Sequence, residues 1–485
     1  MKKYYIYIIL SVAFAARLYH INFPVSGWTS WRQADTAAIA KNFYENSFQL
    51  FYPQIDWRGN TAGYIESEFH IYPFTVALAD TILGFSDSWG RVLSVIFSLF
   101  TIYGIYLLTK KIISEKTALW ASFIYAIIPL NIFYGRAFMP ESLLLMCSVY
   151  GIYFFYQWVE DDSIKFLVYS YIFLTLAVLI KIPTLYLGLP LVYLSYNKFA
   201  KLFLTKWQLW VYAILLIIPV GLWYYHSHNL FLQTGLTFNI WGFGTDKWGN
   251  SDLLLSLKFY NDVFFKSIAE RHLTYAFFIP FLIGLFLKRE NRNERLFDWW
   301  IISVLIYILI VAKGNQVHEY YNLPFVLPAV IFVAKAFAKY FDIKLLKNIN
   351  SKNAVAWLFV LFLIAGAILS YLRYERFMNS ETYDSSLFRL ANSVNKLTDY
   401  SDLTISIDDG NPIVLYRCNR KGWNCYVEQI NSDFIKQRVD NGAKYLMGED
   451  SYFNSEEKAK TLEYLFNNYK TLNRGEDYFI LDLQE

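Results

Sequence analysis

The chain has 485 residues, of which 56% are hydrophobic, 20% aromatic and only 17% charged, and its net charge is +4. A soluble globular protein has about 25% charged residues, so this composition argues against one. The small positive charge gives no reason to expect nucleic acid as a partner, because the basic residues fall in short loops and form no stripe. Many apolar stretches approach the length of about 20 residues that a helix needs to cross a bilayer. We therefore predict a polytopic α-helical membrane protein.

About eleven apolar segments are predicted to span the membrane. In chain order they are 4–21, 90–109, 117–135, 140–158, 165–181, 184–198, 207–225, 273–287, 297–312, 322–340 and 353–373. The tripeptide Lys181-Ile182-Pro183 interrupts the fifth and sixth segments, which form either a helical hairpin or one bent element. The first segment does not resemble a signal peptide, because it lacks a small-residue cleavage site and Arg17 and His20 interrupt its end.

The basic residues indicate the orientation of these segments. With eleven spans, the basic loops, such as those around Lys110 and Arg289, fall on one side of the membrane. Short loops rich in Lys and Arg stay in the cytoplasm. The long loop at 22–88 and everything after residue 374 are then external. We expect a bacterial inner (plasma) membrane protein whose active site faces the periplasm.

The external loop at 22–88 is far longer than a connection between adjacent spans needs to be, which is typical of a folded, functional segment. It carries the acids Asp35, Asp56, Glu66 and Glu68 among tryptophans, prolines and glycines. Within it we predict two interfacial helices. One runs over 31–44, capped by Thr29 or Ser30, and the other over 71–83.

The composition changes after the last span. We therefore predict a membrane domain over 1–375 and a small external α/β domain over 376–485 with a partly parallel sheet. Its expected elements are helices at 385–397, 411–416, 431–441 and 455–468, and strands at 403–408, 444–447, 470–473 and 478–482. Cys418 and Cys425 lie in this domain and are either a short disulfide or two buried thiols.

Several ionisable residues are candidates for chemistry. Asp35 lies early in the first interfacial helix, where the helix dipole favours the ionised form and suits a general base, although a carboxylate that only stabilises its helix is the alternative. The acids Glu66 and Glu68 with His70 are either metal ligands or solvated side chains. The remaining candidates for binding substrate at the external surface are Arg32, Arg136, Glu141, Lys181, Lys313, His318 and Tyr320. Acids and cations that meet beside an apolar wall suit a substrate with a lipid tail and a phosphate head.

In these positions the chain resembles the C-type glycosyltransferases that use lipid-linked sugars, particularly the bacterial aminoarabinose transferases of lipid A and the protein O-mannosyltransferases. The resemblance rests on the order of five segments along the chain. They are Ala34-Asp35-Thr36-Ala37, Glu66-Ser67-Glu68 ahead of Tyr72-Pro73, Arg136 to Leu143, Lys181-Ile182-Pro183, and Val311-Ala312-Lys313-Gly314 ahead of Tyr320-Tyr321-Asn322-Leu323-Pro324. In the aminoarabinose branch a Lys directly follows the second acid, whereas here Phe69 and His70 follow it.

The resemblance implies that Asp35 is the catalytic acid and that Glu68 is the second acid of the active site. It places Lys313 near the lipid phosphate and a soluble α/β domain after the last span. The implied reaction moves a sugar from a polyprenyl-phosphate donor to an envelope glycan, lipid or protein, with inversion at the anomeric carbon. No ligand spacing identifies a cofactor, and a divalent metal ion on Glu68, with His70 or His318, stays open. The alternative functions are a transporter or flippase of polyprenyl-linked glycans and a non-catalytic scaffold.

Overall fold

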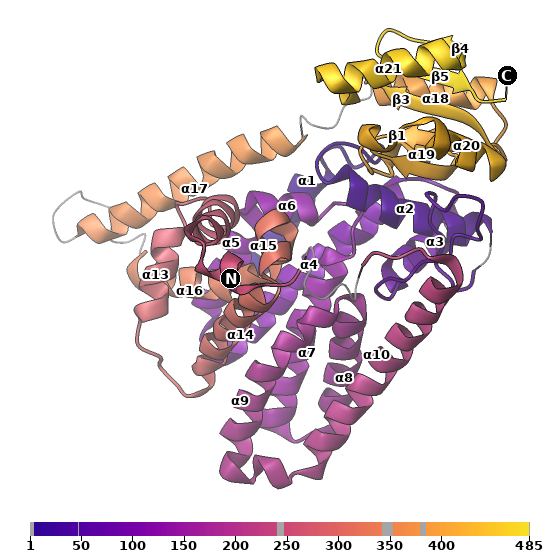
Figure 1. Ribbon diagram of the computed structural model, residues 1–485. Helices are drawn as coiled ribbons and strands as arrows, with labels where there is room; N and C mark the ends of the chain where they lie inside the picture. The colour runs from indigo at the N-terminus through magenta and orange to yellow at the C-terminus, as the bar shows by residue number, and fades with distance from the viewer. Residues whose placement is uncertain (1–3, 47, 240–246, 342–352, 379–384, 485) are drawn as a thin grey trace. The chain divides into compact units, whose positions relative to one another are not determined.

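The computed structural model describes residues 4–46, 48–239, 247–341, 353–378 and 385–484, and it is mostly helical (Figure 1). The chain folds as two compact units. The first unit comprises Met1–Ile21, Arg91–Tyr224 and Trp241–Arg376, and the second comprises Asn22–Gly90, Tyr225–Ile240 and Phe377–Glu485. The long first loop thus belongs to the same unit as the C-terminal residues.

Apolar helices build the first unit. In chain order its main helices are α1 (Tyr5–Leu18), α4 (Ser88–Ile112), α5 (Glu115–Ile127), α6 (Pro129–Tyr134), α7 (Glu141–Asp161), α8 (Ile164–Ile180), η2 (Ile182–Leu187), α9 (Gly188–Phe199), η3 (Ala200–Thr205), α10 (Trp207–Thr234), η4 (Asn261–His272), α13 (Phe278–Phe286), α14 (Leu296–Ile310), α15 (Ala312–Val317), η6 (Glu319–Asn322), α16 (Leu323–Tyr340) and α17 (Ala354–Met378). Each predicted span overlaps at least one of them.

Within the described residues, five helices are long and apolar enough to cross a membrane. They cover Ser88–Ile112, Glu141–Asp161, Trp207–Thr234, Glu319–Tyr340 and Ala354–Glu375. The fold is therefore that of a multi-span membrane protein, while the number of eleven spans stays a prediction.

Prolines explain why some predicted spans are broken. The segment 117–135 is interrupted at Ile128, whose φ of −62° and ψ of 127° are extended. Pro129 follows it, and a proline disfavours helical geometry in the residue before it.

Pro183 likewise lies in the short turn η2 between α8 and α9. Lys181 before this turn pairs with Glu141 at the start of α7, and Lys198 near the end of α9 pairs with Asp162 at the end of α7. The chain therefore reverses direction at η2, which is the helical hairpin of the two alternatives.

Close helix packing in the first unit depends on glycine. A Cβ atom on Gly284 of α13 would lie 1.8 Å from the carbonyl oxygen of Phe332 in α16. Only glycine lets the two backbones approach so closely. Almost all of α16 is buried, as expected for a central helix of the unit.

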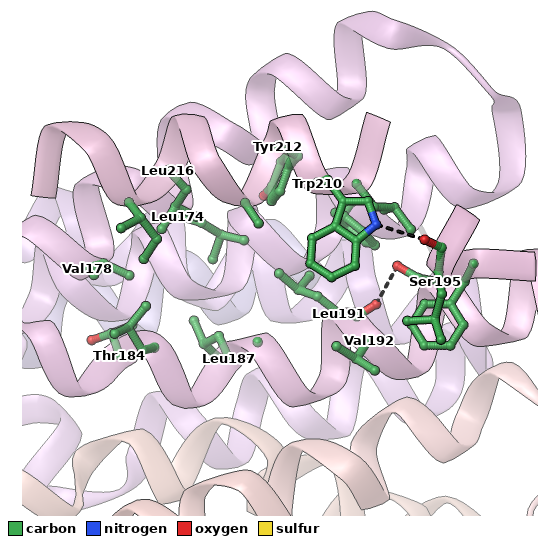
Figure 2. A pocket seen from close by; sticks show the side chains of 18 residues that line it. Leu174, Val178, Thr184, Leu187, Leu191, Val192, Ser195, Trp210, Tyr212 and Leu216 are labelled. Carbon is green, nitrogen blue, oxygen red and sulfur yellow. Dashed lines mark hydrogen bonds between the residues drawn. The ribbon is translucent and has the colours of Figure 1, made fainter. Parts of the chain in front are cut away.

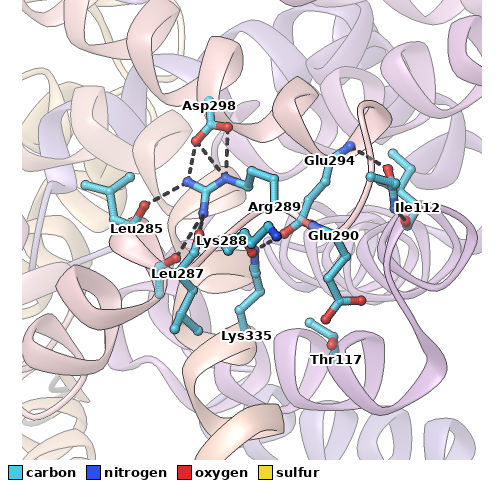
Figure 3. Close-up of polar contacts among 12 residues, drawn as sticks. Ile112, Thr117, Leu285, Leu287, Lys288, Arg289, Glu290, Glu294, Asp298 and Lys335 are labelled. Atoms are coloured by element: carbon cyan, nitrogen blue, oxygen red, sulfur yellow. Dashed lines mark hydrogen bonds and ion pairs between the residues drawn. The ribbon is translucent and has the colours of Figure 1, made fainter.

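Ion pairs organise the basic loop between α13 and α14 (Figure 3). The Arg289 guanidinium donates to both carboxylate oxygens of Asp298, with distances from Nε of 3.1 and 2.9 Å. The Lys335 ammonium of α16 pairs with Glu294, and both side chains are buried. Arg289, one of the cations that indicated a cytoplasmic loop, therefore also ties that loop to α14.

In the second unit the first loop has a folded core. It contains α2 (Ser30–Glu45) and α3 (Ile71–Leu83), close to the two helices predicted there. The buried residues that pack between them and the intervening loop are Ile39, Phe43, Ile55, Ile65 and Ala77. Thr29 precedes α2 in a left-handed conformation and makes no capping hydrogen bond through its side chain, so the predicted cap is wrong in its chemistry.

The C-terminal residues form a five-stranded sheet of order β2-β1-β3-β5-β4. Its strands are β1 (Leu403–Ile407), β2 (Lys421–Cys425), β3 (Ala443–Glu449), β4 (Lys470–Arg474) and β5 (Tyr478–Asp482), and its helices are α18 (Ser386–Leu397), α19 (Ile413–Cys418), α20 (Ser432–Asp440) and α21 (Glu456–Asn468). Strands β2 and β3 pair with β1 in parallel, and β5 runs antiparallel to β3 and β4. The partly parallel sheet was predicted. Cys418 and Cys425 are buried free thiols, which is the second of the two alternatives.

The sequence analysis missed β2. The strand contains Gly422, which favours a turn over a strand, at a φ of 151°. A Cβ atom there would lie 1.9 Å from the carbonyl oxygen of Thr404 in β1. Tertiary contacts on both sides of β2, and not its own propensity, hold it in the sheet.

Candidate functional site

Asp35 lies in the second turn of α2 and its side chain is buried, with the residue 4% exposed. The indole Nε1 of Trp57 donates a hydrogen bond of 2.9 Å to Asp35 Oδ1. Among the residues that the structure describes, Oδ2 has no hydrogen-bond partner. One carboxylate oxygen is thus held in place, and the other remains available to accept a proton.

Burial raises the pKa of Asp35 from 3.8 to about 7. The Trp57 hydrogen bond and the positive charge of Arg32 act in the opposite direction and are outweighed. The expectation that the helix dipole keeps this carboxylate at an ordinary low pKa is therefore wrong, because desolvation dominates. A pKa near neutrality is the value that suits a general base.

Arg32 and Glu68 form an ion pair in the second unit. Arg32 Nη2 lies 3.1 Å from Glu68 Oε2, and both side chains are less than one-fifth exposed. Arg32 also lies over the ring of Phe238, 5.5 Å from its centroid. Arg32 is one turn before Asp35 on α2, so the structure brings Asp35, Arg32 and Glu68 into one neighbourhood.

Glu66 has a different environment from Glu68. Its Oε1 lies 2.8 Å from His228 Nδ1, and its Oε2 accepts a hydrogen bond of 2.5 Å from Thr237. Ser67 and Ser227 are also joined by two hydrogen bonds, of 2.8 and 3.0 Å. These contacts fasten the last turns of α10 and the segment after it to the first loop, so Glu66 has a positioning role in the structure.

His70 is buried at the start of α3. Burial lowers its pKa to about 3, so its ring is neutral at physiological pH. Its Nε2 lies 2.5 Å from the hydroxyl of Ser67. In the described part of the chain, no group of three or more His, Cys, Asp and Glu side chains is arranged to hold a metal ion. A divalent metal ion on Glu68 with His70 or His318 stays a prediction from the sequence.

Asp56 and Lys421 form a buried ion pair that sequence reasoning missed. Lys421 at the start of β2 pairs with Asp56 and donates a hydrogen bond of 2.8 Å to Asn42 Oδ1 in α2. Asn42 Nδ2 in turn lies 3.0 Å from Asp56 Oδ1. Because Trp57 follows Asp56 directly, this cluster fixes the loop that presents the indole to Asp35.

Backbone hydrogen bonds also join the first loop to strand β2. The Gly422 N–H donates to the carbonyl of Asp56 at 3.1 Å, and the Gly59 N–H donates to the carbonyl of Gly422 at 2.7 Å. The first loop thus covers the edge of the C-terminal sheet at β2, which would otherwise expose unpaired backbone groups.

In the first unit, Glu141 and Lys181 are buried together. Glu141 begins α7 and Lys181 lies between α8 and η2, with 3.5 Å between Lys181 Nζ and Glu141 Oε1. The ammonium also lies 4.1 Å from the ring centroid of Tyr321 and 5.0 Å from that of Tyr320. Glu141 Oε2 is buried and has no hydrogen-bond partner among the described residues. Such an atom is costly unless a ligand or water satisfies it.

The other predicted residues of the first unit are distributed around this pair. His318 stacks beside Tyr320 and Tyr321, with ring centroids 5.4 and 5.7 Å away. Arg136 is fully buried and donates to the carbonyl of His20 at 2.9 Å. Lys313 is exposed on α15. The structure thus groups Glu141, Lys181, His318 and Tyr320, and it gives Arg136 a structural partner.

A large apolar groove lies in the same unit (Figure 2). It has a volume of about 470 Å³ and is lined by α7, α8, η2, α9, η3 and α10. Three of its four polar side chains have hydrogen-bond partners within the protein. Trp210 Nε1 donates to Leu204 at 2.8 Å, Ser195 donates to Leu191 at 2.9 Å, and the hydroxyl of Tyr212 bonds with Ser170 at 2.8 Å. The wall of the groove therefore suits a hydrocarbon chain.

The groove adjoins the buried lysine. Thr184 lines both the groove and a small cavity of about 10 Å³, whose walls include Glu141, Lys181 and Tyr320. Thr184 of η2 thus connects the apolar groove with the cavity that contains the Lys181 ammonium. This combination suits an amphiphile with a hydrocarbon tail and an anionic head.

Comparisons with known proteins agree with this geometry. Residues 70–225 match the family model described as dolichyl-phosphate-mannose-protein mannosyltransferase. An uncharacterized protein of Aquifex aeolicus (strain VF5) is 26% identical over 275 residues, which are 54% of this chain. The aligned part spans 59% of that relative's length.

Two solved structures have similar folds. ArnT from Cupriavidus metallidurans, bound to undecaprenyl phosphate, gives a TM-score of 0.68 at 11% identity, covering 98% of this chain and 97% of the other. The archaeal oligosaccharyltransferase AglB from Archaeoglobus fulgidus, in complex with an inhibitory peptide and a dolichol-phosphate, gives 0.56 at 14% identity, covering 97% and 73%. The fold of this chain is therefore similar to the folds of ArnT and AglB. With the matched family segment, it confirms the resemblance to the C-type glycosyltransferases that use polyprenyl-phosphate-linked sugars.

Proposed function

We propose that this protein is a membrane glycosyltransferase that moves a sugar from a polyprenyl-phosphate donor to an envelope glycan, lipid or protein on the external face of a bacterial inner membrane. The observation that carries the proposal is the apolar groove of about 470 Å³ that shares Thr184 with the cavity of Lys181 and Glu141. A prenyl chain suits the groove and its phosphate suits the lysine. The undecaprenyl phosphate bound to ArnT and the dolichol-phosphate bound to AglB support this choice of donor.

The chemical step needs a base and a stabilised leaving group. The acceptor hydroxyl attacks the anomeric carbon, its proton passes to Asp35, and the bond from that carbon to the phosphate oxygen breaks with its electron pair leaving on the phosphate. Because the pKa of Asp35 is about 7, a large fraction of this carboxylate is deprotonated near pH 7 and can accept the proton. Lys181 would stabilise the negative charge on the departing phosphate. One displacement of this kind inverts the anomeric carbon.

An assay of transfer tests the proposal directly. The purified protein is incubated in vesicles with a polyprenyl-phosphate-linked sugar and an acid extract of envelope glycans, and the released polyprenyl phosphate is measured. The rival function, movement of the lipid-linked sugar across the membrane, is measured in the same vesicles without acceptor. Movement without any release of polyprenyl phosphate would overturn the glycosyltransferase and support the flippase.

The pH dependence of transfer should report the ionisation of Asp35. The base works only when deprotonated, and its pKa is about 7. We therefore expect the initial rate to fall about tenfold per pH unit below about pH 7 and to level off above it, as for a single essential base. Initial rates from pH 5 to 9 at saturating donor measure this profile.

The variant Trp57→Phe tests whether the ionisation of Asp35 causes this pH dependence. The indole hydrogen bond lowers the pKa of Asp35, so its removal should move the acid limb to higher pH. Trp207→Phe, at an exposed tryptophan 66% accessible at the start of α10, is the matched control. An acid limb that is the same in all three proteins would mean that another group controls the rate.

Lys181→Met should weaken binding of undecaprenyl phosphate. A hydrogen bond to a charged group contributes about 1.5–3 kcal/mol, which corresponds to about a ten- to hundredfold change in Kd. Binding is measured by calorimetry in detergent micelles. Lys201→Met, at an exposed lysine in η3, is the control.

The variant Lys181→Met leaves Glu141 buried without its cation, so a second variant separates binding from folding. Lys181→Met with Glu141→Gln removes both charges of the pair. If this double variant bound undecaprenyl phosphate as tightly as the unaltered protein, Lys181 would not hold the phosphate.

A further inference from the structure

The second unit contains a pocket that the proposed chemistry does not use. Its volume is about 420 Å³, within the range of about 300–1,000 Å³ that is usual for small-molecule sites. Most of its walls come from three stretches, around Pro24, around Ser86 and around Tyr416, and Lys41 and Phe388 complete the lining. Asp35 is not among the residues that line it.

An ion pair joins these stretches and gives the pocket a fixed wall. Asp87 accepts hydrogen bonds of 2.5 Å from both the hydroxyl of Tyr416 and the guanidinium of Arg417, and one of 3.3 Å from the backbone N–H of Val25. Burial alone would raise the pKa of Asp87, but the charge of Arg417 and these hydrogen bonds lower it below its usual value. The carboxylate is thus ionised and held in place, so the wall is largely formed before a ligand binds.

The second cation of the pocket is also paired. The buried Lys41 ammonium of α2 donates to the side-chain oxygen of Asn419, and it lies 3.7 Å from Glu45 Oε1. Arg417 is likewise paired with Asp87. Each charged side chain of the pocket thus has a partner within the protein.

Neutral hydrogen-bonding groups outnumber charges in the lining. They are Asn22, Ser86, Ser88, Tyr416 and Asn419, against the three charged side chains of Lys41, Asp87 and Arg417. Hydroxyls and amides both donate and accept, which suits a ligand rich in hydroxyl groups. The rings of Phe85 and Phe388 supply apolar wall for the carbon framework of such a ligand. Only these two and Pro24 are apolar, which is too little for a lipid tail.

We propose that this pocket binds a saccharide and holds the glycan that accepts the transferred sugar. The part about the acceptor rests on the proposed function, whereas saccharide binding by the pocket does not. A site built from hydroxyls and amides can recognise the hydroxyls of a ligand, because each of these side chains can both donate and accept hydrogen bonds.

Titration of the full-length protein in detergent micelles tests the proposal. The probes are maltotriose, mannotriose, tri-N-acetylchitotriose and trigalacturonate, and binding is measured by saturation-transfer NMR and calorimetry. Asn22→Trp places an indole in the pocket from an exposed position, and Ser86→Trp does so from a second wall. Asn468→Trp, at an exposed residue that ends α21 outside the pocket, is the matched control.

We expect at least one probe to bind, and its Kd to rise at least tenfold in the two pocket variants but not in the control. Binding should persist in Asp35→Asn, because Asp35 is outside the pocket. If no probe bound, or if both pocket variants bound as tightly as the control, the proposal would be overturned. Saccharide binding without any transfer would overturn the proposed function and leave the pocket assignment intact. Transfer with an acceptor KM that is the same in both pocket variants would leave the proposed function intact and overturn the acceptor role of the pocket.

Discussion

Asp35→Asn is expected to slow sugar transfer by about 10²–10⁴-fold, the usual contribution of a general base. Asparagine has the same shape as aspartate and can still accept the hydrogen bond of 2.9 Å from Trp57. It cannot take the proton of the attacking hydroxyl. The loss should therefore appear in kcat and leave the binding of undecaprenyl phosphate unchanged.

Stability measurements distinguish this loss from a folding defect. The pKa of Asp35 is raised by burial to about 7 in the folded protein, against 3.8 for an ordinary aspartate. The folded state therefore holds the proton more tightly than the unfolded state, and the contribution of Asp35 to stability falls as pH rises from about 4 to about 7. Asparagine stays neutral, so above pH 7 Asp35→Asn should be at least as stable as the unaltered protein.

The control for this experiment is Asp433→Asn, at an exposed aspartate in α20. It should transfer sugar at the normal rate. If Asp35→Asn kept normal kcat across pH 5 to 9, Asp35 would lose its assignment as the base and another residue would have to take the proton.

Lys421→Met should lower the free energy of unfolding of the second unit by about 3–5 kcal/mol, the usual cost of removing one partner from a buried ion pair. Lys421 is 6% exposed and Asp56 is 2% exposed, so water cannot replace the lost ammonium. The first loop should loosen from β2. Limited proteolysis near residues 56–63 and thermal unfolding in detergent measure both effects.

A double variant without either charge tests whether the unpaired carboxylate of Asp56 causes the loss of stability. Lys421→Met with Asp56→Asn removes both charges and keeps an amide beside Asn42, so it should recover much of the lost stability. Lys436→Met, at an exposed lysine in α20, is the control and should change little. If the double variant were as unstable as Lys421→Met alone, the loss would come from packing and not from an unpaired carboxylate.

The same variant bears on the role of the C-terminal domain. Lys421 belongs to that domain, and Asp56 immediately precedes Trp57, which holds Asp35. If this connection positions the base, transfer by Lys421→Met should slow even at temperatures where the protein stays folded. The double variant with Asp56→Asn should then regain rate and stability together.

The sequence by itself determined the features that depend on neighbours along the chain. Hydropathy over about 20 residues indicated the apolar helices, and alternating short patterns indicated most of the C-terminal sheet. The position of Asp35 in a helix of the first loop also followed from local spacing. These features are set by backbone hydrogen bonding and by the separation of apolar from polar residues, which short windows report.

Only the tertiary structure decided what depends on burial and on distant contacts. Strand β2 has no local strand pattern and exists because β1 and the first loop pair with it. Asp56 and Lys421 are 365 positions apart, and no signal in either segment indicates the other. The pKa of Asp35 was expected to follow the helix dipole, but the surrounding unit removes water from the carboxylate and reverses the direction. Desolvation is a property of the whole fold, and no window of sequence contains it.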